Sequence, residues 1–191
     1  GEEQKAKLYN HDMDFKTLAG YLQELEKTAS RNEMTVVLAD MFSKASSEDA
    51  RLLSYVCQGK LGPAYKSPDF GIADKSMVKA LGPKADKLFK QKGDLGLVAQ
   101  ELSIGKGKLS IKEVYAKLWA IATVSGNGSV DKKQQLIINL LAELDPISAK
   151  YAVKMILGKL RTGFSDMTIL DSLSWMLTGD KKLKPQIESM Y

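Results

Sequence analysis

Apolar residues recur along this chain at every third or fourth position, which is the spacing of one face of an α-helix. Two early runs, at 15–25 and 37–42, follow this spacing with Phe, Leu, Ala, Val and Met. No segment of comparable length alternates with period two, so we expect an all-α fold with about ten helices in one domain. Beyond the two early runs, the pattern predicts helices at about 47–58, 74–81, 84–92, 94–102, 110–125, 129–143, 146–158 and 166–178.

Residues typical of helix ends separate these runs. Three predicted starts carry serine or Asp-Pro, and glycine follows four predicted ends: Ser110, Ser129 and Asp145-Pro146 at starts, and Gly59, Gly82, Gly126 and Gly158 at ends. The long irregular stretch is GKLGPAYKSPDFG at 59–71. Its prolines and glycines predict an ordered loop rather than a flexible linker.

The chain contains a weak internal repeat. A shift of 99 positions, from Ser30 to Ser129, also places Ala50 on Ala149 and the GKL of 59–61 on the GKL of 158–160, without a gap. The apolar positions at 37–42 fall on those at 136–141. Each half then has a capped helix, a turn, a second helix and a GKL end. Two amphipathic helix pairs also match by chance, so duplication and coincidence both stay open at this point.

The reactive side chains are few. His11 is the only histidine and Cys57 the only cysteine, so neither a Ser-His-Asp or Cys-His site nor a structural zinc site is expected. We therefore expect no catalytic residue and no metal ligand in this chain. A single cysteine cannot form an internal disulfide, which favours a reducing compartment. No apolar run approaches the roughly 20 residues of a membrane span, and the amino end lacks a signal-peptide stretch. We expect a cytoplasmic protein.

The charge is slightly positive and unevenly spread. Lys and Arg outnumber Asp and Glu by 28 to 23 in 191 residues, with 15 against 14 in residues 1–100 and 13 against 9 in residues 101–191. This bias fits a polyanionic partner and equally an ordinary solvated surface.

Two glycine-rich basic segments are candidates for phosphate binding. Residues 125–129 (SGNGS) lead directly into a predicted helix that carries Lys132 and Lys133 near its start, where lysines oppose the helix dipole unless an anion lies nearby. The alternative is that both lysines are simply solvated. The second segment, GKLRTGF at 158–164, places two cations beside two glycines, a combination suited to a nucleic-acid backbone. The loop GKGK at 105–108 follows no strand and lacks the NTPase phosphate-loop pattern.

Several segments resemble the amino-terminal DNA-binding domain of ATP-dependent DNA ligases of the archaeal and eukaryotic replicative type. They are KGDLGLVAQ at 92–100, GNGSVDKKQQLIINLL at 126–141 and AKYAVKMILGKLRTGFSDMTILDSLS at 149–174. FKTLAGYLQELEKTASRNEMTVVLADMF at 15–42 and LLSYVCQGKLGPAYKSPDFGIADKSMVKAL at 52–81 resemble the first half of the same domain, in the same order. The combination of KGDLG, GSxxxK and GKLRTG is specific, although each motif alone is weak.

The resemblance implies an all-helical domain with an internal pseudo-two-fold duplication that grips duplex DNA across the minor groove. It implies DNA binding without sequence preference, which positions nicked DNA during replication, repair and recombination. The first copy departs from the second at Gly62-Pro63, where the second has Arg161-Thr162. The expected DNA-binding residues are Ser30, Arg31, Lys60, Lys92, Gly93, Gly126, Gly128, Ser129, Lys132, Lys133, Gly158, Lys159, Arg161 and Gly163.

The family's adenylated lysine lies in a K-x-D-G motif, and the nearest string here, KGDL at 92–95, ends in leucine. The resemblance therefore implies that this chain alone is inactive, and that ATP and Mg²⁺ belong to an absent nucleotidyltransferase domain followed by an OB-fold. We expect residues 1–12 to be a disordered extension or an artificial remnant, 13–180 to be the DNA-binding domain, and 181–191 to begin a linker. The partners implied are nicked duplex DNA, the parent's catalytic domains and a sliding clamp, with the protein nucleoid-associated when bound to DNA.

Two other interpretations stay open. One is a non-catalytic helical scaffold for protein interactions, since duplicated helix pairs are common in such proteins. The other is an enzyme with an unrecognised site, which the poor inventory of reactive groups disfavours.

Overall fold

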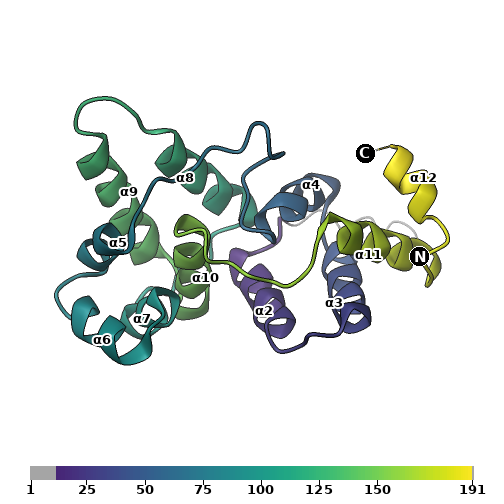
Figure 1. Cartoon of the computed structure of the whole chain (residues 1–191), viewed down its shortest axis with the longest axis horizontal. Helices are drawn as coiled ribbons and strands as arrows, with labels where there is room; N and C mark the ends of the chain where they lie inside the picture. The colour runs from purple at the N-terminus through teal and green to yellow at the C-terminus, as the bar shows by residue number, and fades with distance from the viewer. Residues whose placement is uncertain (1–11, 191) are drawn as a thin grey trace.

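The structure, a computed structural model, describes residues 12–190, and within that range it is all-α. All ten predicted helices are present, and an eleventh, α12, lies in the segment predicted as a linker (Figure 1). Asp12 apart, the predicted amino-terminal extension lies outside the described residues. The helices are α2 (Phe15–Leu25), α3 (Arg31–Ser43), α4 (Ser47–Val56), α5 (Asp74–Leu81), α6 (Ala85–Lys92), α7 (Leu95–Leu102), α8 (Ile111–Thr123), α9 (Ser129–Glu143), α10 (Pro146–Ile156), α11 (Asp166–Thr178) and α12 (Lys184–Ser189).

The helices bury their apolar stripes in one continuous core. Phe15, Leu18 and Leu22 of α2 are almost fully buried, and Leu118 of α8 and Tyr151 of α10 join the same cluster. The single cysteine, Cys57, is fully buried in this core. Burial raises the pKa of its thiol to about 12, which leaves it unreactive at neutral pH. None of the helices in the described part of the chain is long and apolar enough to cross a membrane.

The helix contacts are exchanged between the two halves. The 99-residue shift places α2, α3 and α4 on α8, α9 and α10. In the structure α4 packs against α8 while α10 packs against α2, and α5 packs against α9 while α11 packs against α3 (Figure 1). If α5 is the counterpart of α11, each of these four contacts has a partner contact in which the halves swap roles, whereas the contact between α7 and α10 has no counterpart among the described helices. This reciprocity is what an internal pseudo-two-fold duplication produces.

A second part of the repeat appears only with a different shift. Gly71-Ile72-Ala73-Asp74 corresponds to Gly163-Phe164-Ser165-Asp166 at a shift of 92, so the first copy's loop is seven residues longer. Both glycines have positive φ, 60° and 75°, and both aspartates open a helix, α5 and α11. The gap-free comparison of the sequence missed this correspondence because it did not allow for the longer loop.

Candidate nucleic-acid interface

The start of α9 is built to expose backbone N–H groups. Gly126 and Gly128 have φ of 86° and 74°, a conformation that favours glycine. Gly128, not Ser129, is the N-cap, and no side chain caps the helix. The Ser129 N–H donates to the Gly126 carbonyl at 3.1 Å, which folds the turn. An uncapped helix start of this kind suits an anion, because its N–H groups and the helix dipole both favour negative charge.

The two lysines beside this start have different roles. Lys133 Nζ donates to the carbonyl oxygen of Phe70 at 2.7 Å and so fastens the 59–73 loop to α9. Lys132 is exposed and forms no ion pair with another residue of the described chain. Lys132 is therefore the cation at this helix start that a phosphate would meet.

The corresponding start of α3 is already satisfied within the protein. The Ser30 hydroxyl accepts a hydrogen bond from the Glu33 N–H at 3.4 Å and caps the helix. Arg31, the first helical residue, places Nη2 3.1 Å from Oδ2 of Asp171 on α11. The repeat predicts two capped starts, whereas the structure has one capped start and one open start. The difference arises because Gly128, which has no side chain to accept a hydrogen bond, occupies the N-cap position that Ser30 fills in the first half.

The GKLRTGF segment crosses from α10 to α11 and contacts the other half. Lys159 Nζ lies 2.7 and 2.8 Å from the two carboxylate oxygens of Asp74, at the start of α5. Arg161 is exposed and has no ion-pair partner among residues 12–190. Gly163 sits where an added Cβ would lie 3.2 Å from Cε of Met34, so the segment passes close to α3. Arg161 is thus the cation that this segment leaves for an external partner.

The first copy's GKL makes the reciprocal contact through a glutamine. Gln58 Nε2 donates to Oδ1 of Asp166, at the start of α11, at 2.8 Å. Lys60 Nζ donates to Oε1 of the same glutamine at 3.4 Å. A Cβ at Gly59 would lie 3.3 Å from Cβ of Leu160, so the two GKL ends meet. The half-buried Lys60 is consequently less available than Lys132 or Arg161.

The 59–73 loop adjoins both the α9 start and the end of α10, whereas Lys92 and Gly93 lie apart from them. Residues 68–73 and residues 155–158 line a shared groove, and the first of these segments is the one held by Lys133. Lys92 and Gly93 lie elsewhere, at the end of α6, on the opposite edge from the 124–128 loop in Figure 1. Lys92 pairs with Glu101 at 2.6 Å, and Gly93, with φ of 69°, closes α6 by donating to the Phe89 carbonyl. In the structure, the KGD motif at 92–94 therefore forms the junction between α6 and α7.

Comparison with known proteins shows the family to which this chain belongs. The model of the family described as DNA ligase N terminus matches residues 14–174. The chain belongs to this family. It is 37% identical over 187 residues to a probable DNA ligase of Dictyoglomus thermophilum, covering 94% of this chain and 32% of that protein. DNA ligases of Acidianus ambivalens and Sulfolobus acidocaldarius are 35% and 37% identical, each over 94% of this chain and 34% of the relative. The chain thus spans about a third of the length of these relatives.

Two features of this ligase N-terminal domain escaped sequence reasoning. Gly71 carries the positive φ that turns the longer loop beside Lys133, and its signal was the GIAD string that matches GFSD. Asp171 is buried on α11 and paired with Arg31 from 140 residues away, and no local pattern indicates that contact. Within the described residues, no group of three or more His, Cys, Asp or Glu side chains is placed to hold a metal ion.

Proposed function

We propose that this ligase N-terminal domain binds double-stranded DNA with little sequence preference and holds nicked DNA for the catalytic domains of a DNA ligase. The supporting observation is the uncapped start of α9, with two positive-φ glycines and the unpaired Lys132. Backbone N–H groups, lysine and arginine are the groups that bind phosphates rather than base edges. The family and its ligase relatives favour DNA as the polyanion. We propose replication, repair and recombination as the processes that this binding serves.

The reciprocal packing of the two halves suggests how the domain would contact both strands of a duplex. The two backbones of a duplex are related by local two-fold axes, so a domain with two equivalent helix starts can present one to each strand. The α9 start and Arg161 form the stronger side, because neither cation has an internal partner within residues 12–190. The α3 start forms the weaker side, because Ser30 and Arg31 are engaged within the protein. A minor-groove approach fits such a two-sided grip on the backbones.

The salt dependence of binding tests the proposal. If the domain neutralises on the order of 5 phosphates, log K should fall with log salt at a slope of about −4 to −5. Fluorescence anisotropy with labelled duplexes of unrelated sequence should give the same slope and similar affinities for all of them. A flat salt response, or a strong preference for one sequence, would contradict phosphate binding of this kind.

The chemistry belongs to the parent ligase. In this proposal the absent domains hold ATP and Mg²⁺, while this domain positions the nick. The sequence has no K-x-D-G lysine, so we expect the purified chain neither to form a covalent AMP adduct nor to seal nicks. Incubation with labelled ATP, followed by denaturing electrophoresis, checks this. A stable labelled band would contradict the assignment.

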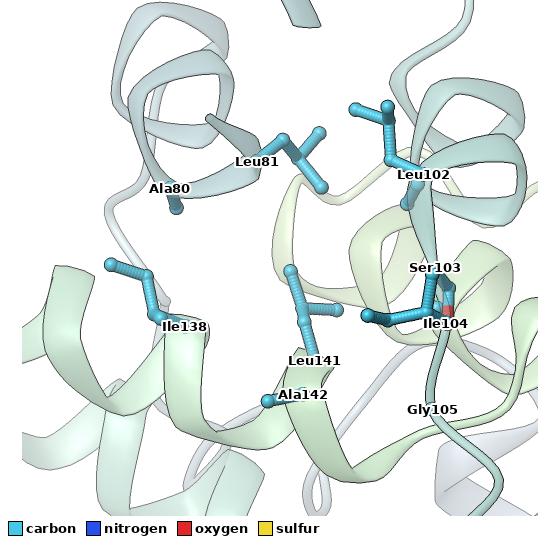
Figure 2. A pocket seen from close by; sticks show the side chains of 11 residues that line it. Ala80, Leu81, Leu102, Ser103, Ile104, Gly105, Ile138, Leu141 and Ala142 are labelled. Carbon is cyan, nitrogen blue, oxygen red and sulfur yellow. The ribbon is translucent and has the colours of Figure 1, made fainter. Parts of the chain in front are cut away.

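A protein-interaction role is the second candidate, and one surface favours it. An apolar pocket lies between α5, α7 and α9, and Leu81, Leu102 and Leu141 form its walls (Figure 2). Ile104, on the segment that follows α7, also lines it. Ile104 is 93% exposed, which is unusual for a large apolar side chain. A contact with a protein such as a sliding clamp would belong to this function. A pure scaffold would bind DNA weakly and without the salt slope given above.

A further inference from the structure

Asp171 is a buried carboxylate with more positive partners than it needs. Its side chain is 3% exposed, on the face of α11 that packs against α3. Arg31 Nη2 lies 3.1 Å from Oδ2, Lys181 Nζ lies 3.5 Å from Oδ2, and Lys184 Nζ lies 2.8 Å from Oδ1. A buried carboxylate left without any partner is strongly destabilising. One close cation removes most of that penalty, and Lys184 is the closest of the three. While Lys184 is present, Arg31 is in surplus; without it, Arg31 becomes the closest partner, because Lys181 lies farther away at 3.5 Å.

The three cations come from two places. Arg31 belongs to the first turn of α3, whereas Lys181 and Lys184 come from the carboxy-terminal segment that forms α12. Lys181 also lies 3.5 Å from Oδ1 of Asn32, so this segment rests against the same turn of α3. Burial alone would raise the pKa of Asp171, but the close ammonium group of Lys184 and the charges of Lys181 and Arg31 lower it. The carboxylate therefore stays ionised and continues to require a cation.

Exposure decides which cation is the surplus one. The Arg31 side chain is 56% exposed, against 37% for Lys181 and 22% for Lys184. Arg31 is therefore the cation that can turn toward a phosphate, while the two lysines remain on the carboxylate. If the lysines were absent, Arg31 would be the sole partner of Asp171 and its departure would leave a buried charge uncompensated.

We propose that Lys181 and Lys184 are positioning residues for DNA binding, which release Arg31 from Asp171 so that it can contact a DNA phosphate. The inference rests on the proposed function and extends it to the carboxy-terminal segment. Docking of α12 strengthens the grip of the α3 side on DNA. By reciprocity, DNA bound at Arg31 favours docked α12, because only then is Asp171 neutralised by the lysines.

The test is a double-mutant cycle on the purified chain, with a duplex-DNA anisotropy readout. Lys184→Ala should weaken binding about five- to tenfold and lower the salt slope by about 1. Lys182→Ala is the matched control, because Lys182 is two residues away, exposed, and paired with Asp180 at 3.1 Å. It should change affinity by less than about twofold, in line with an exposed ion pair. In an Arg31→Ala background, Lys184→Ala should cause no further loss.

A second background guards against misfolding. In Asp171→Asn the carboxylate no longer competes for Arg31, so adding Lys184→Ala should leave DNA affinity unchanged at an equal melting temperature. Loss of affinity that persists in either background means that Lys184 acts on DNA directly, which overturns the inference, and no loss in the unaltered chain overturns it too. If Arg31→Ala is silent while Lys132→Ala weakens binding, this inference fails and the proposed function stands. If neither weakens binding, the proposed function fails as well.

Discussion

The starts of α9 and α3 occupy equivalent places in the duplicated fold but are prepared for different partners. At α9 two left-handed glycines precede an uncapped turn, and Lys132 has no ion-pair partner among the described residues. At α3 the Ser30 hydroxyl caps the helix and Arg31 is paired with Asp171. The α9 start leaves its N–H groups and Lys132 available to an external anion, whereas Ser30 and Arg31 at the α3 start are engaged within the protein. The shared scaffold therefore fixes where the two starts lie, while a few end residues decide how strongly each binds an anion.

The polar contacts that join the two halves also differ, in how far they are buried. Between α2 and α10, Glu26 accepts from Lys150 at 3.0 Å, from Lys154 at 2.8 Å and from the Tyr151 hydroxyl at 2.8 Å. Between α4 and α8, the corresponding link is Lys112 with Glu48 at 2.7 Å, where the Glu48 side chain is 60% exposed. Lys150 is only 9% exposed. Equivalent helix pairs are thus joined by a half-buried network on one side and by a solvated ion pair on the other.

The largest expected effect comes from weakening the half-buried network. Glu26→Gln should lower the free energy of unfolding by about 2 kcal/mol, or about 4–8 °C in Tm, because hydrogen bonds to a charged acceptor are lost. Glu48→Gln is the matched change on the other side and should shift Tm much less, because water screens that pair. Thermal unfolding followed by circular dichroism at pH 7 compares the two variants. Equal losses would mean that burial does not distinguish the two links.

The pH dependence of stability sharpens the same prediction. Burial opposes ionisation of Glu26, but hydrogen bonds from Lys154, Lys150 and Tyr151 outweigh it and lower its pKa below the ordinary 4.5. A carboxyl whose folded pKa is depressed stabilises the fold above its unfolded pKa and loses that contribution as pH falls through the folded pKa. The difference in Tm between the unaltered chain and Glu26→Gln should therefore shrink as pH falls below about 4.5.

The sequence predicted the helices well because their signals are local. The expected ranges 74–81, 129–143 and 166–178 coincide with α5, α9 and α11, whose apolar spacing and end residues lie within each segment. The sequence did not predict α12, because that helix has no buried residue and its Lys184 is held by a carboxylate on α11. The same limit applies to the candidate site. Gly126, Gly128 and Lys132 are neighbours in the chain, whereas the engagement of Arg31 and Lys159 depends on distant aspartates.

A smaller effect is expected where the second half turns beside α3. Gly163 has φ of 75°, and an added Cβ would lie 3.2 Å from Cε of Met34. Gly163→Ala should cost about 1 kcal/mol or more, because alanine is strained at positive φ. Gly20 is the matched control, since it lies inside α2 with nothing within 4 Å of an added Cβ. Gly20→Ala should stabilise by about 0.5–1 kcal/mol. Urea unfolding of both variants should give changes of opposite sign, and a loss of stability in Gly20→Ala would contradict this account of the two glycines.

The smallest effects on folding, and the direct test of the comparison between the helix starts, come from single cations. Lys132→Ala and Arg161→Ala should each weaken duplex binding for all sequences alike and lower the salt slope by about 1. Their stability should change by no more than about 0.5 kcal/mol, as is usual for exposed charges. Lys159→Ala should also weaken binding, but with a fall in Tm, because it removes the pair with Asp74. Lys60→Ala should weaken binding least of these, since Lys60 is half-buried beside Gln58.

The controls decide between a two-sided grip and diffuse attraction. Lys16, in the first turn of α2, and Lys27, just beyond the end of α2, are exposed and lie outside the α3 and α9 starts and the GKL loops. If binding depends on the placement of cations at the α9 start and the 158–163 turn, Lys16→Ala and Lys27→Ala should leave affinity nearly unchanged at the same ionic strength. If they weaken binding as much as Lys132→Ala and Arg161→Ala do, any positive charge on the surface would serve equally. The open start of α9 would then have no special role, and the contrast between the two halves would describe folding alone.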